Sequence, residues 1–197
     1  MAKLQTFIKF AIPRCYSPVS FDKVSLHIFS DASKEAYACV AYLRVESNSG
    51  VFCAFVCAKT RVAPMKRETI PRLELLSCVL SARLLKYLTD SLGELSFSDI
   101  FLWTDSKVAL SWIVNPKVCR GSFVQNRVRE IRSLSSISDC NHVSGENNPV
   151  DCMTRFTSLV DVERWHSGPA WLSLAPSFWP VSQFSTDIVP ELSLIHI

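Results

Sequence analysis

The sequence has 197 residues, of which 48% are hydrophobic and 20% are charged, and its formal net charge is +3. This length and this amount of apolar material suit one folded domain with short appendages, and they exclude an intrinsically disordered chain. The net charge is too small to indicate a nucleic-acid partner by itself, so the places where basic residues cluster matter more than their total.

Cysteine spacing and apolar runs exclude several further classes of protein. The eight cysteines form no CxxC pair and no Cys/His cluster with zinc-ligand spacing, so we expect buried free thiols in a reducing compartment. The N-terminal stretch lacks the hydrophobic region of a signal peptide, and no apolar run reaches the roughly 18 residues of a membrane span. We therefore expect an intracellular protein that does not cross a membrane.

The first third of the chain predicts a connector followed by a β-meander. Residues 1–22 contain prolines that interrupt any long element, which is typical of a connector from an upstream region. Apolar runs predict strands at 24–30, 35–45 and 51–58, and the cluster SNSG at 47–50 predicts a hairpin turn. Strands joined by such short turns pair in antiparallel order.

The middle of the chain predicts helices that alternate with short strands. A helix opens at Pro71 and continues to about residue 91, because proline favours the first helical turn and leucines recur every three or four positions. The elements expected after it are a strand at 100–104, a short helix at 106–114, an amphipathic helix at 123–134, a strand at 140–143 and a helix beginning at Pro149. A meander followed by helical crossovers predicts an α/β fold with a mixed five-stranded sheet and helices on its faces.

The C-terminal part of the chain differs in composition. Residues 159–190 include WHSGPAWLSLAPSFWP, which is rich in tryptophan and proline and has no clear periodicity. We interpret this segment as an irregular appendage packed on the domain, or as a linker to another domain. Residues 191–197 look unrelated to what precedes them and are interpreted as a non-native tail. The folded domain is thus expected at 23–158.

Four acidic residues stand out by their positions. Asp31 and Asp105 each end a predicted strand, Glu74 lies near the start of the long predicted helix, and Asp151 lies near the start of the last one. Each of them alone has a structural explanation, as a turn residue, a helix cap or an acid in a first helical turn. Because ligands of open α/β sheets gather at the carboxyl ends of the strands, the four together favour a common site.

A cluster of carboxylates indicates a particular chemistry. Several carboxylates cannot all stay ionised side by side unless a positive charge compensates them. Mg²⁺ prefers oxygen ligands, and two such ions about 4 Å apart can activate water and stabilise a leaving oxygen. The four acids therefore predict metal-assisted hydrolysis of a phosphodiester.

The motifs around these acids resemble a known family. FSDAS, IPRLELLSCVLSARL, WTDSKVALSWI and HVSGENNPVDCMTR together resemble the ribonuclease H domain of polyproteins from LTR retrotransposons of the Pao/BEL class. KTRVAP and the segment WHSGPAWL…FWP are also similar to that class. The resemblance covers about residues 20 to 180, and the motifs are specific as a set, whereas TDS alone would be weak.

The resemblance implies a fold, an activity and a set of ligands. It implies a ribonuclease H-like sheet of order 3-2-1-4-5 and endonucleolytic cleavage of the RNA strand of RNA–DNA hybrids with two Mg²⁺ ions, or Mn²⁺ in their place. Asp31 would bridge both metals, Glu74 and Asp105 would complete one site, and Asp151 would complete the other. Many ribonucleases H also carry a histidine just before the last acid. His142 lies earlier than that position, so we interpret it as a packing residue or as one that supports a metal ligand.

The resemblance also implies partners. The domain would lie between an upstream reverse transcriptase and a downstream integrase region of one polyprotein, in the cytoplasm and within virus-like particles. Phosphates of the hybrid need cations, and 2′-hydroxyls must be read to distinguish RNA from DNA. The residues expected to contact the hybrid are Ser33, Lys59, Arg61, Arg72, Ser106 and Lys107.

Two alternatives remain open at this point. The first is a catalytically silent ribonuclease H-like domain kept for connection or interaction, although such a relic would be free to lose its acids. The second is an aspartic peptidase, a label sometimes given to the Pao region. Retroviral-type peptidases use an Asp-Thr/Ser-Gly triplet, and neither Asp31-Ala32-Ser33 nor Asp105-Ser106-Lys107 supplies the glycine.

Overall fold

The computed structural model describes residues 22–65, 68–93, 95–119, 121–155 and 162–180. All but the last residue of the expected N-terminal connector, and the whole expected tail, lie outside the described residues. The described cysteines are free thiols, as expected from their spacing.

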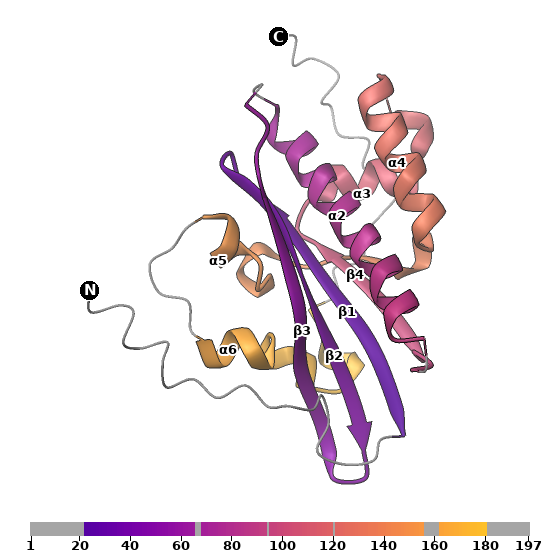
Figure 1. Ribbon diagram of the computed structural model, residues 1–197, viewed down its shortest axis with the longest axis vertical. Coiled ribbons are helices and arrows are strands. Elements are labelled where there is room, and N and C mark those ends of the chain that lie inside the picture. Colours follow the sequence, from indigo (N-terminus) through magenta and orange to yellow (C-terminus); the bar gives the residue numbers. More distant parts are fainter. Residues whose placement is uncertain (1–21, 66–67, 94, 120, 156–161, 181–197) are drawn as a thin grey trace, which may run out of the picture.

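A mixed five-stranded sheet of order β3-β2-β1-β4-β5 forms the centre of the molecule (Figure 1). The strands β1, β2 and β3 pair antiparallel, whereas β4 runs parallel to β1 and β5 runs parallel to β4. This topology confirms the predicted sheet and its strand order. The bounds of the strands are β1 Lys23–Ala32, β2 Ala36–Ser47, β3 Gly50–Val62, β4 Asp99–Thr104 and β5 Cys140–His142.

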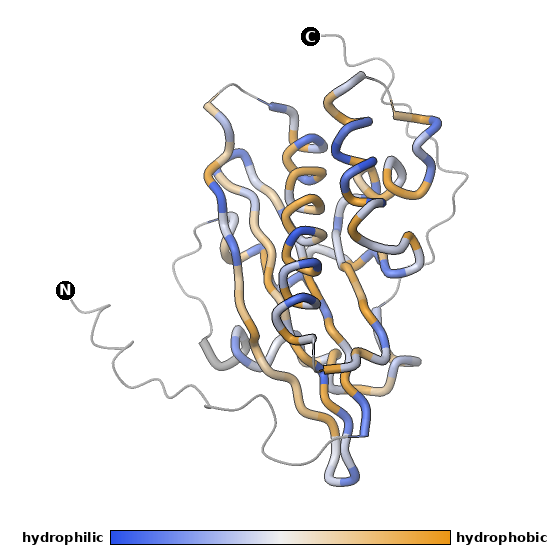
Figure 2. Tube along the Cα trace, turned by 45° about the vertical axis from the view of Figure 1, so that its right-hand side comes forward, coloured by the Kyte–Doolittle hydropathy of each residue, from blue (hydrophilic) through white to orange (hydrophobic). Residues whose placement is uncertain are grey.

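Three helices cover one face of the sheet (Figure 1). They are α2 at Ile70–Ser91, α3 at Lys107–Val114 and α4 at Ser122–Leu134. Figure 2 shows hydrophobic and hydrophilic residues alternating along these helices, as expected of helices with one side against a core. In α4 the buried residues are Val124, Val128 and Ile131, which recur at helical spacing.

The opposite face of the sheet carries the C-terminal segments. Short helices α5 at Asp151–Thr154 and α6 at Val162–Ser167 lie there (Figure 1), followed by two turns of 3-10 helix. The sequence predicts a helix beginning at Pro149. In the structure this helix, α5, begins at Asp151 and is four residues long. Among the described residues, no helix is both long enough and apolar enough to cross a bilayer.

A buried arginine fastens the tryptophan-rich segment to this face. Trp171 and Leu172 are buried in the same cluster as Phe29 of the central strand. Arg44 in β2 is only 3% exposed, and its guanidinium donates to the carbonyl oxygen of Leu172 at 2.8 Å. The same guanidinium lies 5.4 Å from the centre of the Trp179 ring. The described part of this segment, residues 162–180, thus contributes to the core.

Candidate active site

Two strand ends bring Asp31 and Asp105 to one edge of the sheet. The parallel pairing of β1 with β4 places Ser30 opposite Thr104, so the next residue of each chain segment emerges at the same edge. Asp31 is 4% exposed and Asp105 is half-buried. This placement agrees with the argument that acids at the carboxyl ends of neighbouring strands share one site.

Helix α2 adds Glu74 through a hydrogen bond to the start of α3. Glu74 is half-buried, and Ser106 Oγ donates to its Oε2 at 2.5 Å. Ser106 is also the N-cap of α3, where its Oγ accepts a hydrogen bond from the backbone N–H of Ala109 at 3.0 Å. The cap is therefore Ser106 and not Asp105, which leaves the Asp105 carboxylate available for other contacts.

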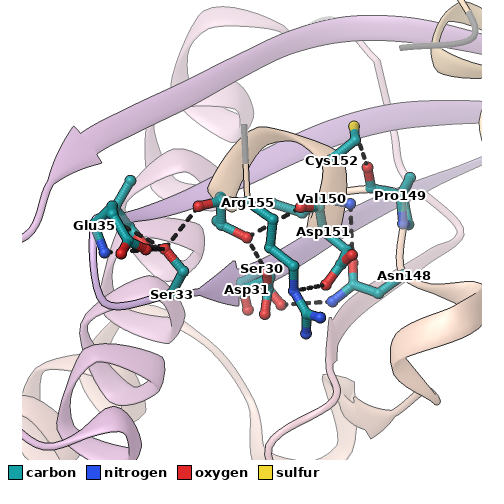
Figure 3. Close-up of polar contacts among 12 residues, drawn as sticks. Ser30, Asp31, Ser33, Glu35, Asn148, Pro149, Val150, Asp151, Cys152 and Arg155 are labelled. Atoms are coloured by element: carbon teal, nitrogen blue, oxygen red, sulfur yellow. Dashed lines mark hydrogen bonds and ion pairs between the residues drawn. The ribbon is translucent and has the colours of Figure 1, made fainter. Parts of the chain in front are cut away.

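The turn at α5 brings Asp151 to Asp31 (Figure 3). The hydroxyl of Thr154, which is fully buried, donates to Asp31 Oδ2, and Ser33 Oγ donates to the carbonyl oxygen of Thr154 at 2.7 Å. Asn148 Nδ2 donates to the carbonyl oxygen of Ser30 at 2.9 Å. These bonds hold the short helix against the end of β1. They therefore restrict the positions that the Asp151 carboxylate can occupy.

The four carboxylates influence one another electrostatically. Burial raises the pKa of Asp105 from 3.8 to about 7, together with the charges of Asp31, Glu74 and Asp151, of which Asp31 contributes most. Burial also raises the pKa of Glu74 and of Asp151, and Asp31 adds to both. The hydrogen bond from Ser106 and the charge of Arg155 oppose these increases. The charge of Asp31 thus disfavours ionisation of each of the other three acids.

Two carboxylate oxygens of these acids are buried without a hydrogen bond. They are Asp105 Oδ1 and Asp151 Oδ1, the second of which forms an ion pair with Arg155 but no hydrogen bond among the described residues. A methyl group added at Gly145 would lie 3.3 Å from Asp105 Oδ2, so the backbone of this turn closes over the carboxylate. A buried oxygen without a donor is costly, and a hard divalent cation would satisfy it. The oxygen-rich donor set therefore fits Mg²⁺ or Mn²⁺ in kind.

The carboxylates are not fully assembled around such an ion. In the described part of the chain, no group of three or more His, Cys, Asp or Glu side chains has an arrangement that would hold a metal ion as it stands. Three of the acids contact donors of the chain itself. These pairs are Asp31 with Thr154, Glu74 with Ser106 and Asp151 with Arg155.

The basic residues expected at the hybrid lie at different distances from the acids. Lys107 is exposed on the first residue of α3 and follows Asp105 by two positions. Lys59 Nζ lies 4.8 Å from the centre of the Tyr87 ring, which is about 20 Å along α2 from Glu74.

The two arginines of this set lie on the side of α2 and α4. Arg72 pairs with Glu68 at 2.9 Å and lies over the Phe123 ring. Arg61 lines a groove of about 230 Å³ together with Arg83 and Arg127. This face therefore carries arginines of which Arg72 and Arg83 are paired with Glu68 and Glu130.

His142 lies behind Asp105. It is 7% exposed, its Nε2 lies 3.2 Å from the carbonyl oxygen of Asp105, and burial lowers its pKa. Thr154, Asn148 and Arg155, which contact the strand end or the acids directly, were not among the expected site residues. For Thr154 and Arg155 the available signal was their spacing in NNPVDCMTR, three and four residues after Asp151, whereas Asn148 precedes Asp151 by three residues.

The sheet order and the edge of acidic residues define a ribonuclease H-like domain. Residues 1–106 match the family described as the Pao retrotransposon-like RNaseH-like domain, and the chain belongs to this family. The matched residues include Asp31, Glu74 and Asp105, whereas Asp151 follows them. A comparison with curated proteins found no match.

Solved structures similar to this chain include several ribonucleases H. RNase H1 from Halobacterium salinarum is 14% identical, with a TM-score of 0.37 and coverage of 64% of this chain and 88% of that one. The N-terminal RNase H domain of a Mycobacterium tuberculosis protein is 12% identical, with a TM-score of 0.43 and coverage of 68% and 91%. LC11-RNase H1 in complex with RNA/DNA hybrid is 11% identical, with a TM-score of 0.41 and coverage of 64% and 88%.

Proposed function

We propose that this chain hydrolyses the RNA strand of RNA–DNA hybrids with the help of two divalent cations, Mg²⁺ or Mn²⁺. The proposal depends on the gathering of four acids at one edge of the sheet, with one buried oxygen of Asp105 lacking a donor. An RNaseH-like family assignment supports the same reaction class.

The side chains have separate tasks in this proposal. Asp31 bridges the two cation sites, Glu74 and Asp105 complete one of them, and Asp151 completes the other. Thr154 and Ser106 restrict the orientations of Asp31 and Glu74 through their hydroxyl groups. A bound pair of divalent cations would supply an activated water and stabilise the leaving oxygen.

The proton on Asp105 makes cation binding depend on pH. With a pKa of about 7, this carboxyl is partly protonated near neutral pH in the chain alone. A cation that binds its carboxylate must displace this proton. We therefore expect cation affinity to rise with pH until Asp105 is fully ionised.

Contacts with the hybrid are proposed at several cationic residues. Lys107 would contact the phosphate nearest the acids, because it is exposed and adjoins Asp105. Lys59, Arg61 and Arg72 would extend the contact along the helical face, where each phosphate bound adds to the salt dependence. The contribution of Ser33 and Ser106 would be indirect, because their hydroxyls already hydrogen-bond to Thr154 and Glu74.

In its biological setting, the domain would act during reverse transcription of a retrotransposon in the cytoplasm. Its neighbours in the polyprotein would be a reverse transcriptase upstream and an integrase region downstream. The family assignment supports a retrotransposon origin, on which this setting depends.

One alternative has an observation in its favour. A catalytically silent connection or interaction domain would agree with the fact that no described group of acids is already arranged to hold an ion. The aspartic peptidase gains no support from a mixed sheet with helices on both faces, since that peptidase fold is small and all-β.

Hydrolysis of a labelled hybrid tests these functions against one another. We expect Mg²⁺-dependent cleavage of the RNA strand that is lost with EDTA and with Asp105→Asn, and no cleavage of the DNA strand. Lys86→Gln, which alters an exposed ion pair on α2, is the control for a change of charge. Peptide cleavage blocked by an aspartic-peptidase inhibitor would favour the peptidase, and absence of both activities would favour the silent domain.

A further inference from the structure

Arg155 is paired with one of the four acids. Its Nε lies 2.7 Å from Asp151 Oδ1, one helical turn away in sequence. Figure 3 shows the Arg155 side chain directed towards Asp151, with Asp31 close by at the end of β1. Of the ion pairs among the described residues, this is the one that involves any of the four acids.

The Arg155 contact differs from the two other contacts that hold acids. Thr154 and Ser106 donate from neutral, buried hydroxyl groups, so they can keep their bonds beside a bound cation. Arg155 is a full positive charge on a side chain that is 62% exposed, and Asp151 is 32% exposed. An exposed ion pair of this kind is weak and its flexible side chain can move into solvent at little cost.

A cation at Asp151 and the guanidinium cannot both use the same oxygen. Like charges within about 4 Å repel one another, most strongly where burial limits screening by water. The charge of Arg155 already offsets part of the repulsion between Asp151 and Asp31, which is the task that a divalent ion would take over.

We propose that Arg155 and a divalent cation are alternative partners of Asp151, so that the guanidinium must leave Asp151 before the second cation site can form. This inference rests on the proposed function, because it assumes that the four acids bind divalent cations. Arg155 is thus a positioning residue that sets the affinity for the cation through Asp151.

The direct test is isothermal titration calorimetry, in which Mn²⁺ alone is titrated into the chain. Arg155→Gln should bind Mn²⁺ more tightly than the natural chain, by about two- to fivefold, because an exposed pair of this kind is worth little more. Arg155→Lys keeps the charge and should remain close to the natural affinity. Lys86→Gln removes the same charge from a similar exposed pair with Asp90 and should change nothing.

A second readout follows the guanidinium itself. The side-chain N–H resonance of Arg155, assigned by its loss in Arg155→Lys, should shift when Mg²⁺ is added. In Asp151→Asn this resonance should already resemble that of a free arginine and should not respond to Mg²⁺. Circular dichroism of each variant establishes that the fold is retained, and a merely structural arginine would not move with the ion.

The outcomes separate this inference from the proposed function. Mn²⁺ binding that is abolished by Asp105→Asn but unchanged or weakened by Arg155→Gln would overturn the role of Arg155 and leave the metal centre standing. Absence of Mn²⁺ binding in every variant would overturn both. Tighter binding in Arg155→Gln, together with a Mg²⁺-dependent shift of the Arg155 resonance, is the result that we expect.

Discussion

The hydroxyl of Thr154 donates a hydrogen bond to Oδ2 of Asp31, although the two residues are 123 positions apart in the sequence. Asp31 belongs to the central strand and Thr154 ends the short helix α5. This bond joins the first acid of the site to the turn that carries the last one. The precision of the site therefore depends on residues that bind no substrate themselves.

Removing this hydroxyl should impair both the site and the stability of the fold. Thr154→Val preserves the shape of a fully buried side chain but leaves a carboxylate oxygen of Asp31 without its donor. We expect a loss of about 2 kcal/mol in the free energy of unfolding, and a fall in hybrid cleavage of about tenfold or more. Urea unfolding and cleavage rates would measure the two effects. Thr154→Ser should retain both, and equal loss in the Ser and Val variants would argue against the bond.

Asp105 should make stability depend on pH. Folding raises its pKa to about 7, so the folded chain retains a proton that the unfolded chain releases. Ionisation of Asp105 then destabilises the fold increasingly from about pH 4 to pH 7, and fully above that range. Asp105→Asn avoids this cost, so its gain in stability over the natural chain should be largest above neutral pH and vanish towards acid. Thermal unfolding at several pH values would measure this gain.

Divalent cations should stabilise the natural chain as the Asp105→Asn substitution does. Above neutral pH, Mg²⁺ should raise the unfolding temperature of the natural chain, because a ligand that binds only the folded state stabilises it. The unfolding temperature of Asp105→Asn should rise much less when Mg²⁺ is added. A gain for Asp105→Asn that is the same at all pH values, or an equal response of both chains to Mg²⁺, would contradict this interpretation of Asp105.

Ser106 should contribute to stability through two bonds. Ser106→Ala removes the N-cap of α3 and the donor to Glu74, so we expect a loss of about 1–2 kcal/mol in the free energy of unfolding. Ser106→Thr keeps both bonds available and is the matched comparison. Chemical denaturation measures the loss, and an Ala variant as stable as the natural chain would exclude the cap.

The buried arginine at the opposite face should matter more than exposed arginines. Arg44→Ala loses the bonds to the carbonyl oxygens of Leu172 and Leu174 and the contact with Trp179. We expect a loss of about 3 kcal/mol in the free energy of unfolding, and earlier proteolysis of the tryptophan-rich segment. Arg83→Ala, which breaks an exposed pair with Glu130, should cost about 0.5 kcal/mol or less. Similar losses in both variants would show that Arg44 does not fasten the segment.

The strands and three of the acids were predictable because local patterns determine them. Asp31 and Asp105 end apolar runs, and Glu74 belongs to a helix with clear leucine spacing. General rules of connection predicted a mixed five-stranded sheet, whereas the order of its strands was predicted from the family resemblance. Strand β3 continues to Val62, beyond the apolar run, because pairing with β2 supplies hydrogen bonds to polar residues as well. As a result Arg61 belongs to β3, beyond the end of the strand expected at 51–58.

The contacts that complete the site were not predictable in the same way. Thr154 and Arg155 act through one turn of helix whose position depends on tertiary hydrogen bonds to β1. The segment around Trp171 has no period because its described part consists of a short helix and 3-10 turns packed by aromatic side chains. Such contacts form between distant parts of the chain, so spacing along the sequence does not predict them.

The most direct measurement of the central claim is the location of Mn²⁺ by anomalous scattering from crystals of the chain soaked with MnCl₂. We expect two peaks about 4 Å apart among the carboxylates of Asp31, Glu74, Asp105 and Asp151, with Arg155 turned away from Asp151. Peaks that lie elsewhere, or carboxylates that keep their present partners at saturating Mn²⁺, would contradict this claim.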